Sequence, residues 1–149
     1  MPIRFAHTNI VARDWRRLAR FYQEVFDCRP VPPERDYRGP TIGEIAGVGA
    51  ERLTGVHLRV PGYGDDGPTL ELFQYEPAGE PVTIRANTPG FSHIAFAVDD
   101  VRAVAERVFE HGGRPVGAYR EIDIAGAGRL AVWYVADPEG NIVELQTWL

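Results

Sequence analysis

The sequence is poor in cysteine: among 149 residues there is a single one, Cys28. A lone cysteine excludes an intrachain disulfide and a zinc site built on several thiolates. The sequence around Cys28 contains no residue that would act as its base, so we expect a small buried side chain rather than a nucleophile. Scarce cysteine is also typical of proteins from a reducing cytoplasm, which is the location we predict.

The chain also lacks long runs of one kind of residue. Its first ten residues, MPIRFAHTNI, contain no long apolar segment, so we predict no signal peptide. No apolar run approaches the roughly 20 residues that span a bilayer, and we therefore expect no membrane partner. Basic and acidic residues are mixed along the chain, and the net charge is −5. This charge pattern argues against a nucleic-acid partner.

Turn-forming residues, by contrast, are frequent. The 16 Gly and 12 Pro favour short strands joined by turns over a helical bundle. We expect strands at residues 3–11, 53–60, 67–75, 91–98, 115–118, 130–136 and 140–148. Apolar stripes at helical spacing predict two helices, which begin after Asp14 and Asp100 and end near Phe26 and His111. The Pro- and Gly-rich residues 29–50 predict at most a short edge strand followed by a loop, of the kind that forms a lid or a binding loop.

The strongest pattern is an internal repeat. FAH at residues 5–7 matches FSH at residues 91–93, and each is followed by a strand, an Asp cap, a helix and the segment RPV. Each half ends in a Gly-x-x-x-Glu-Leu strand, which contains Glu71 or Glu144. Repetition of this kind indicates a duplicated strand–helix–strand–strand–strand unit. We therefore predict an α+β fold for residues 1–149, with two βαβββ modules at about residues 1–78 and 88–149 whose mixed sheets curl into a cup.

Strand alternation predicts that four side chains lie on the sheet faces that the helices leave uncovered. The aliphatic neighbours of Glu71 and Glu144 occupy the opposite faces and should pack on the helices. His7 and His93 share the uncovered faces with the two glutamates. If the sheets curl toward each other, the four side chains line one concavity, where a divalent cation would balance the carboxylates and bind the imidazoles. Such a donor set suits Fe, Mn, Co, Ni or Zn, and positions left to water are typical of a catalytic site.

These motifs resemble the vicinal oxygen chelate superfamily, which includes glyoxalase I, methylmalonyl-CoA epimerase, extradiol dioxygenases and the bleomycin and fosfomycin resistance proteins. The resemblance is carried by His7 in FAHTNIV, Glu71 in TLELFQY, His93 in FSHIAFAVDD and Glu144 in DPEGNIVELQ. It covers nearly the whole chain and implies the glyoxalase/bleomycin-resistance/dioxygenase fold, with these four side chains as ligands of one divalent metal ion. It also implies a homodimer, with the cup formed either within one chain or between two.

Within the superfamily the sequence is most similar to glyoxalase I of the small bacterial type, which has a Glu at the position of Glu71. The resemblance implies a lyase or isomerase that acts on a small-molecule substrate. The metal would chelate two neighbouring oxygens of that substrate, and a carboxylate would move a proton next to a carbonyl. We predict Glu144 as the catalytic base and Glu71 as its partner.

Three other activities stay open. An epimerase of the methylmalonyl-CoA type usually has Gln at the position of Glu71. An extradiol-type, iron-dependent dioxygenase needs only two His and one Glu, and it usually has a longer chain. A resistance protein that binds a drug or toxin without catalysis often lacks the metal ligands, which are intact here.

Six further residues are predicted to contact the substrate. His57 and Arg59 share one strand face, where they would bind an anionic group of the substrate. The other four are expected to line the cup: Asn9, Phe73, Trp133 and Gln146.

Overall fold

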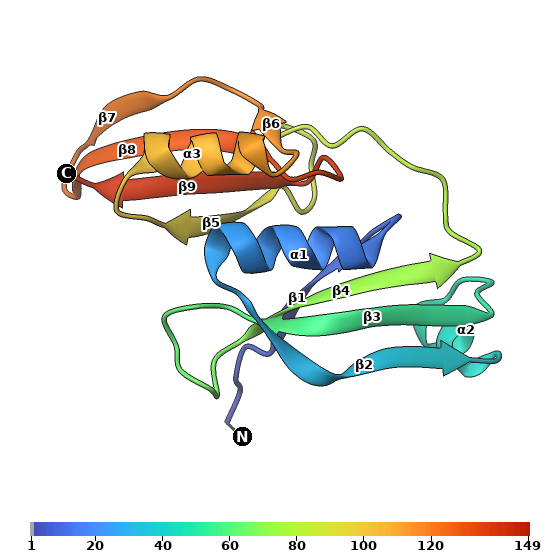
Figure 1. The fold of residues 1–149 in the computed structure, drawn as a ribbon. Helices are drawn as coiled ribbons and strands as arrows, with labels where there is room; N and C mark the ends of the chain where they lie inside the picture. The colour runs from blue at the N-terminus through green and yellow to red at the C-terminus, as the bar shows by residue number, and fades with distance from the viewer. Residues whose placement is uncertain (1) are drawn as a thin grey trace. The chain divides into compact units, whose positions relative to one another are not determined.

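The computed structural model describes residues 2–149 (Figure 1). It contains two similar units, each built from strands and one long, capped helix. The two units are Met1–Pro81 and Val82–Leu149. The elements of the first unit are β1 (His7–Val11), α1 (Trp15–Phe26), β2 (Arg29–Arg38), α2 (Thr41–Ala46), β3 (Arg52–Arg59) and β4 (Thr69–Glu76). Those of the second are β5 (His93–Ala97), α3 (Val101–Glu110), β6 (Arg114–Pro115), β7 (Arg120–Ile124), β8 (Gly128–Ala136) and β9 (Ile142–Trp148).

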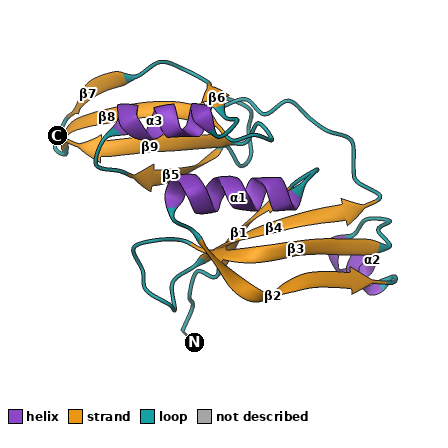
Figure 2. Ribbon diagram, viewed as in Figure 1, coloured by secondary structure: helices purple, strands orange, loops and turns teal. Residues whose placement is uncertain are grey.

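Each unit contains one mixed sheet (Figure 2). In the first unit the strand order is β1-β4-β3-β2, with β1 parallel to β4 and the other pairs antiparallel. In the second unit the order is β5-β9-β8-β6, with β5 parallel to β9, and β7 also pairs with β8. The predicted α+β fold with two βαβββ modules is therefore confirmed.

Both long helices begin at the predicted caps. The Asp14 carboxylate accepts a hydrogen bond from the backbone N–H of Arg17, and the Asp100 carboxylate accepts two, from the backbone N–H groups of Arg102 and Ala103. Such side chains satisfy the unpaired amides of a first helical turn, and each cap contributes about 1 kcal/mol. The first helix ends at Phe26 as predicted, and the second ends at Glu110, one residue earlier than predicted.

The helices cover one face of each sheet. α1 packs on β3 and β4, and α3 packs on β8 and β9. Leu72 and Leu145, which directly follow the two repeated glutamates, are fully buried on these faces. Burying a leucine side chain contributes about 1.5–3 kcal/mol, so each core fixes the alternation that sends the preceding glutamate to the other face.

The prediction for residues 29–50 is only partly right, because the edge strand is longer than expected and a helix replaces part of the loop. β2 runs through the Pro-rich stretch, and α2 follows it. β2 is an edge strand, and its register with β3 shifts between Val31 and Arg35. Pro32 and Pro33 lie within this irregularity, where the missing N–H groups remove no ladder hydrogen bond.

The strand predicted at residues 115–118 is mostly wrong, because only Pro115 of this range lies in a strand and a further strand follows it. β6 covers only Arg114–Pro115, and β7 covers Arg120–Ile124, for which no strand was predicted. All five residues of β7 are exposed, and its sequence REIDI has only two apolar residues, Ile122 and Ile124, which is too short a pattern to identify a strand. Both strands pair with β8, as the two parts of β2 pair with β3.

The first and fifth strands begin later than predicted, at His7 and His93 rather than at residues 3 and 91. Among residues 2–149, no helix is both long and apolar enough to cross a membrane.

Cys28 is buried, as predicted, with 3% of its surface exposed. Burial raises the pKa of its thiol from 9.0 to about 12, and the neighbouring Asp27 adds to the shift. This higher pKa lowers the fraction of thiolate at pH 8 about 1000-fold, and the thiolate is the reactive form of cysteine.

We expect Cys28 to react with a thiol reagent such as DTNB only after the protein is denatured, as followed by absorbance. Rapid labelling of the folded protein would contradict this placement.

Candidate metal centre

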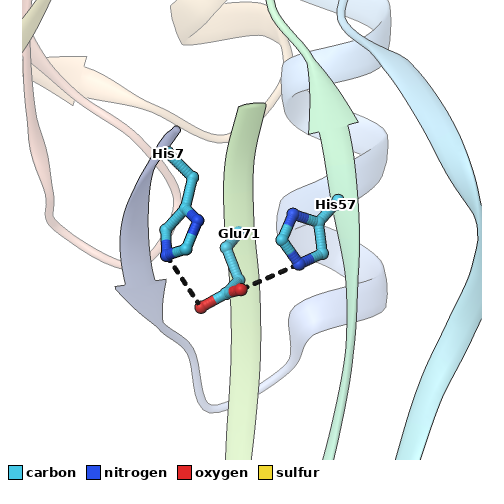
Figure 3. Close-up of side chains that lie close together, drawn as sticks. All are labelled: His7, His57 and Glu71. Carbon is cyan, nitrogen blue, oxygen red and sulfur yellow. Dashed lines mark ion pairs between the residues drawn. The ribbon is translucent and has the colours of Figure 1, made fainter. Parts of the chain in front are cut away.

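Strand register brings three side chains of the first unit together around Glu71. β4 lies between β1 and β3, and in these ladders Glu71 pairs with His57 on one side and with Asn9 on the other. His7 lies two residues before Asn9 and therefore on the same face of β1. Figure 3 shows His7, His57 and Glu71 pointing toward one another from three neighbouring strands. The predicted clustering of His7 with Glu71 is therefore seen within this unit, and His57 joins it.

The distances in this cluster are short. His57 Nε2 lies 2.8 Å from Glu71 Oε2, and His7 Nε2 lies 3.6 Å from Glu71 Oε1 (Figure 3). One potential ligand atom from each residue lies within 4.8 Å of the other two. The Glu71 side chain is only 12% exposed, so its carboxylate depends on these neighbours for much of its solvation.

Two polar side chains hold this cluster in place. Asn9 Nδ2 donates a hydrogen bond of 3.0 Å to Glu71 Oε1. His57 Nδ1 lies 2.9 Å from the hydroxyl oxygen of Thr69, which is itself buried. Both nitrogens of the His57 ring are therefore in contact with a fixed oxygen, which restricts the rotation of the ring.

Burial lowers the pKa of His57 below its usual range. Glu71 opposes this shift, whereas the Coulombic interactions of His57 with Arg35 and His7 add to it. At neutral pH the ring is therefore neutral. A carboxylate only accepts hydrogen bonds, so in this arrangement Nε2–H donates to Glu71 and Nδ1 accepts from the Thr69 hydroxyl.

The second unit repeats the His–Glu pair at the same strand positions. His93 Nε2 lies 2.8 Å from Glu144 Oε2, and the Glu144 side chain is 14% exposed. Tyr134 of β8 pairs with Glu144, and its ring centroid lies 4.7 Å from that of His93. Burial raises the pKa of Tyr134, and the charge of Glu144 and a hydrogen bond to it raise it further. The phenol therefore keeps its proton at neutral pH.

Aligning the two units by their strand registers shows two differences around the carboxylate. Tyr134 pairs with Glu144 as His57 pairs with Glu71, and Ala95 takes the place of Asn9. Sequence reasoning missed Tyr134. The signal that could have found it is the pairing of β8 with β9, which places Tyr134 rather than its neighbour beside Glu144.

The other predicted substrate contacts lie at different places. Phe73 is on the Glu71 face, with its ring centroid 6.2 Å from that of His57. Arg59 shares that face and donates a hydrogen bond to the carbonyl of Gly67. Gln146 shares a face with Glu144 because it lies two residues further along β9.

Trp133 lies on the opposite face from Glu144. It pairs with the buried Leu145, and its ring centroid lies 5.6 Å from that of Phe109 on α3. Its indole N–H donates to the carbonyl of Gly117. The structure therefore gives Trp133 a packing role beside the helix and does not bring it to the His93–Glu144 pair.

The donor chemistry of both clusters fits a divalent metal ion. Two imidazoles and a carboxylate in the first unit, and one of each in the second, are donors that Fe, Mn, Co, Ni and Zn accept. In each unit the strands hold these donors on the sheet face opposite the long helix of that unit, and a set of three protein ligands leaves positions for water or substrate. Open positions of this kind are typical of catalytic metal sites, whereas structural sites are closed.

Comparison with known proteins supports the fold. A search of curated protein sequences gives no match. A glyoxalase family protein from Bacillus cereus is 19% identical, with a TM-score of 0.80 over 100% of this chain and 96% of that one. The fosfomycin resistance protein FosX from Listeria monocytogenes is 16% identical, with a TM-score of 0.61 over 100% and 96% of the chains.

A virulence protein from Salmonella typhimurium is 22% identical, with a TM-score of 0.58 over 100% of this chain and 99% of that one. At these identities the solved structures establish the fold alone. The sequence itself matches the profile of the Glyoxalase/Bleomycin resistance protein/Dioxygenase superfamily over residues 4–145. Because that match spans nearly the whole chain, the protein belongs to this superfamily.

Proposed function

We propose that the protein is a metal-dependent enzyme that moves a proton next to a carbonyl of a small substrate, as a glyoxalase I-like lyase or isomerase does. The observation that carries the proposal is the repeated His–Glu pair, His7 with Glu71 and His93 with Glu144, at equivalent positions of the two units. In each unit the pair lies on the sheet face opposite the long helix of that unit.

The metal-binding residues would be His7 and Glu71 in the first unit and His93 and Glu144 in the second. Once bound, a divalent ion supplies Lewis-acid polarisation of substrate oxygens. The protein side chains contribute the remaining chemistry, because the two half-buried carboxylates are placed to accept and return protons.

We assign the base role to Glu144 because its carboxylate has fewer anchors than that of Glu71. Asn9 donates to Glu71, whereas Ala95 at the same place in the second unit has no donor to offer Glu144. Glu144 would take the proton from the substrate carbon and return it to the neighbouring carbon. Tyr134, which keeps its own proton, would hold the Glu144 carboxylate through their hydrogen bond.

Metal content and turnover together test this function. Protein purified without chelator is expected to contain Ni, Co or Zn and to convert methylglyoxal with glutathione. Treatment with EDTA should abolish turnover, and re-addition of the same metal should restore it, as measured by elemental analysis and absorbance.

Other outcomes would replace the proposal with one of its alternatives. Ferrous iron together with cleavage of a catechol ring would identify a dioxygenase. Metal-dependent epimerisation of an acyl-CoA would identify an epimerase. Metal-free protein that binds a drug tightly would identify a resistance protein. Fosfomycin belongs in that binding assay because FosX proteins from Listeria monocytogenes and Mesorhizobium loti share the fold.

A further inference from the structure

The two units differ at the strand position that faces the carboxylate. His57 occupies it in the first unit and Tyr134 in the second. Imidazole is a common ligand of divalent metal ions, whereas the phenol of tyrosine is a much less common one. The first unit therefore has one more good metal donor than the second.

We propose that His57 is a third metal ligand in the first unit, so that His7, His57 and Glu71 hold a divalent ion even without the ligands of the second unit. The inference rests on the metal dependence of the proposed function but not on the reaction. It predicts that metal binding survives the removal of the ligands in the second unit.

The geometry of the cluster supports direct ligation. Ligand atoms bound to one ion at octahedral angles lie roughly 3 Å apart, since metal–nitrogen and metal–oxygen bonds are about 2.1 Å long. The Glu71 oxygens lie 2.8 Å from His57 Nε2 and 3.6 Å from His7 Nε2. All three donors can therefore reach one ion with small side-chain movements and no change of strand register. Two histidines and one carboxylate on one face also form a known type of site for divalent iron.

Thr69 allows the His57 ring to change its role. When Nε2 binds a metal it must carry no proton, so the proton of the neutral ring moves to Nδ1. Nδ1–H would then donate to the Thr69 hydroxyl oxygen, which lies 2.9 Å away and which either donates or accepts. A fixed oxygen of this kind behind the ring orients a histidine ligand in many metal sites.

The competing interpretation is that His57 only hydrogen-bonds to Glu71 and never touches the metal. Metal affinity alone does not separate the two, because losing either a ligand or its support lowers affinity about 10- to 100-fold. The number of imidazoles bound to the ion does separate them. X-ray absorption spectroscopy of the zinc-loaded, full-length protein gives that number.

The test uses His93→Ala, which removes the imidazole of the second unit. We expect zinc in this variant to keep two imidazole ligands, from His7 and His57. Adding His57→Tyr should reduce the number to one and weaken zinc binding at least 10-fold by titration. Tyrosine is the matched replacement because Tyr134 occupies the same place in the second unit. Adding Tyr134→Phe to His93→Ala is the control, and it should leave the number of imidazole ligands of zinc unchanged.

The inference would be overturned if zinc in the His93→Ala variant had a single imidazole ligand. It would also be overturned if adding His57→Tyr did not reduce the number of imidazole ligands. Circular dichroism verifies the fold of each variant, and His57→Gln replaces His57→Tyr if the latter does not fold. If the His93→Ala variant has two imidazole ligands but the unmodified protein turns over no substrate, only the proposed function is refuted. Turnover together with a single imidazole in His93→Ala would refute only the role of His57.

Discussion

Replacing Glu144 with Gln is expected to lower kcat about 100- to 10,000-fold in the glyoxalase-type assay, which is the usual contribution of a general base. The amide has nearly the same shape as the carboxylate and keeps an oxygen for the metal, but it cannot take a proton from carbon. His93 and Tyr134 contact the side chain at this position, so they should hold the amide where the carboxylate lies. Most of the metal should be retained in elemental analysis.

Glu110→Gln provides the matched control, because this exposed glutamate ends α3 and is not among the proposed site residues. Its kcat should equal that of the unmodified protein. If Glu144→Gln also turned over substrate at the full rate, Glu144 would lose the base role. Glu71→Gln would then be the next variant to measure.

Replacing Asp137 with Ala is expected to lower the free energy of unfolding by about 3 kcal/mol, because three partly buried donors lose their partner. Asp137 is 1% exposed and lies in the turn that leads into β9. Its Oδ1 accepts from the backbone N–H groups of Glu139 and Asn141 at 2.9 and 3.0 Å, and its Oδ2 accepts from Asn141 Nδ2 at 2.9 Å. Urea denaturation followed by circular dichroism would give the change.

Asp99→Ala is the control for this loss, since Asp99 is exposed in the turn before α3. Surface substitutions of this kind usually change stability by less than about 0.5 kcal/mol. An equally small effect of Asp137→Ala would show that the backbone of this turn is maintained without the carboxylate.

The sequence predicts those parts of the fold in which local pattern and burial agree. Glu71 and Glu144 each lie between two aliphatic residues, and the burial of Leu72 and Leu145 fixes the face of each glutamate. Asp14 and Asp100 mark both long helices because capping depends on residues that are adjacent in the chain. These features were predictable because each depends on a few neighbouring residues.

The parts that could not be predicted depend on pairing between distant strands. Tyr134 lies beside Glu144 only because of the register of β8 with β9, which residue pattern alone does not give. His57 was predicted to bind a substrate anion, and the same kind of pairing places it against Glu71 and Thr69. β7 escaped prediction because it is exposed and is held by hydrogen bonds and ion pairs to β8 rather than by an apolar face.

The position of β1 has a consequence for the dynamics of the cluster. This five-residue strand, which carries His7, pairs only with β4 at the edge of its sheet, whereas Glu71 lies on the central β4. Edge strands open locally at a lower free energy than central ones, so fraying would withdraw His7 and leave His57 and Glu71 in place. A bound cation would oppose this fraying, and amide hydrogen exchange in the first dozen residues would then report how much of the protein is loaded.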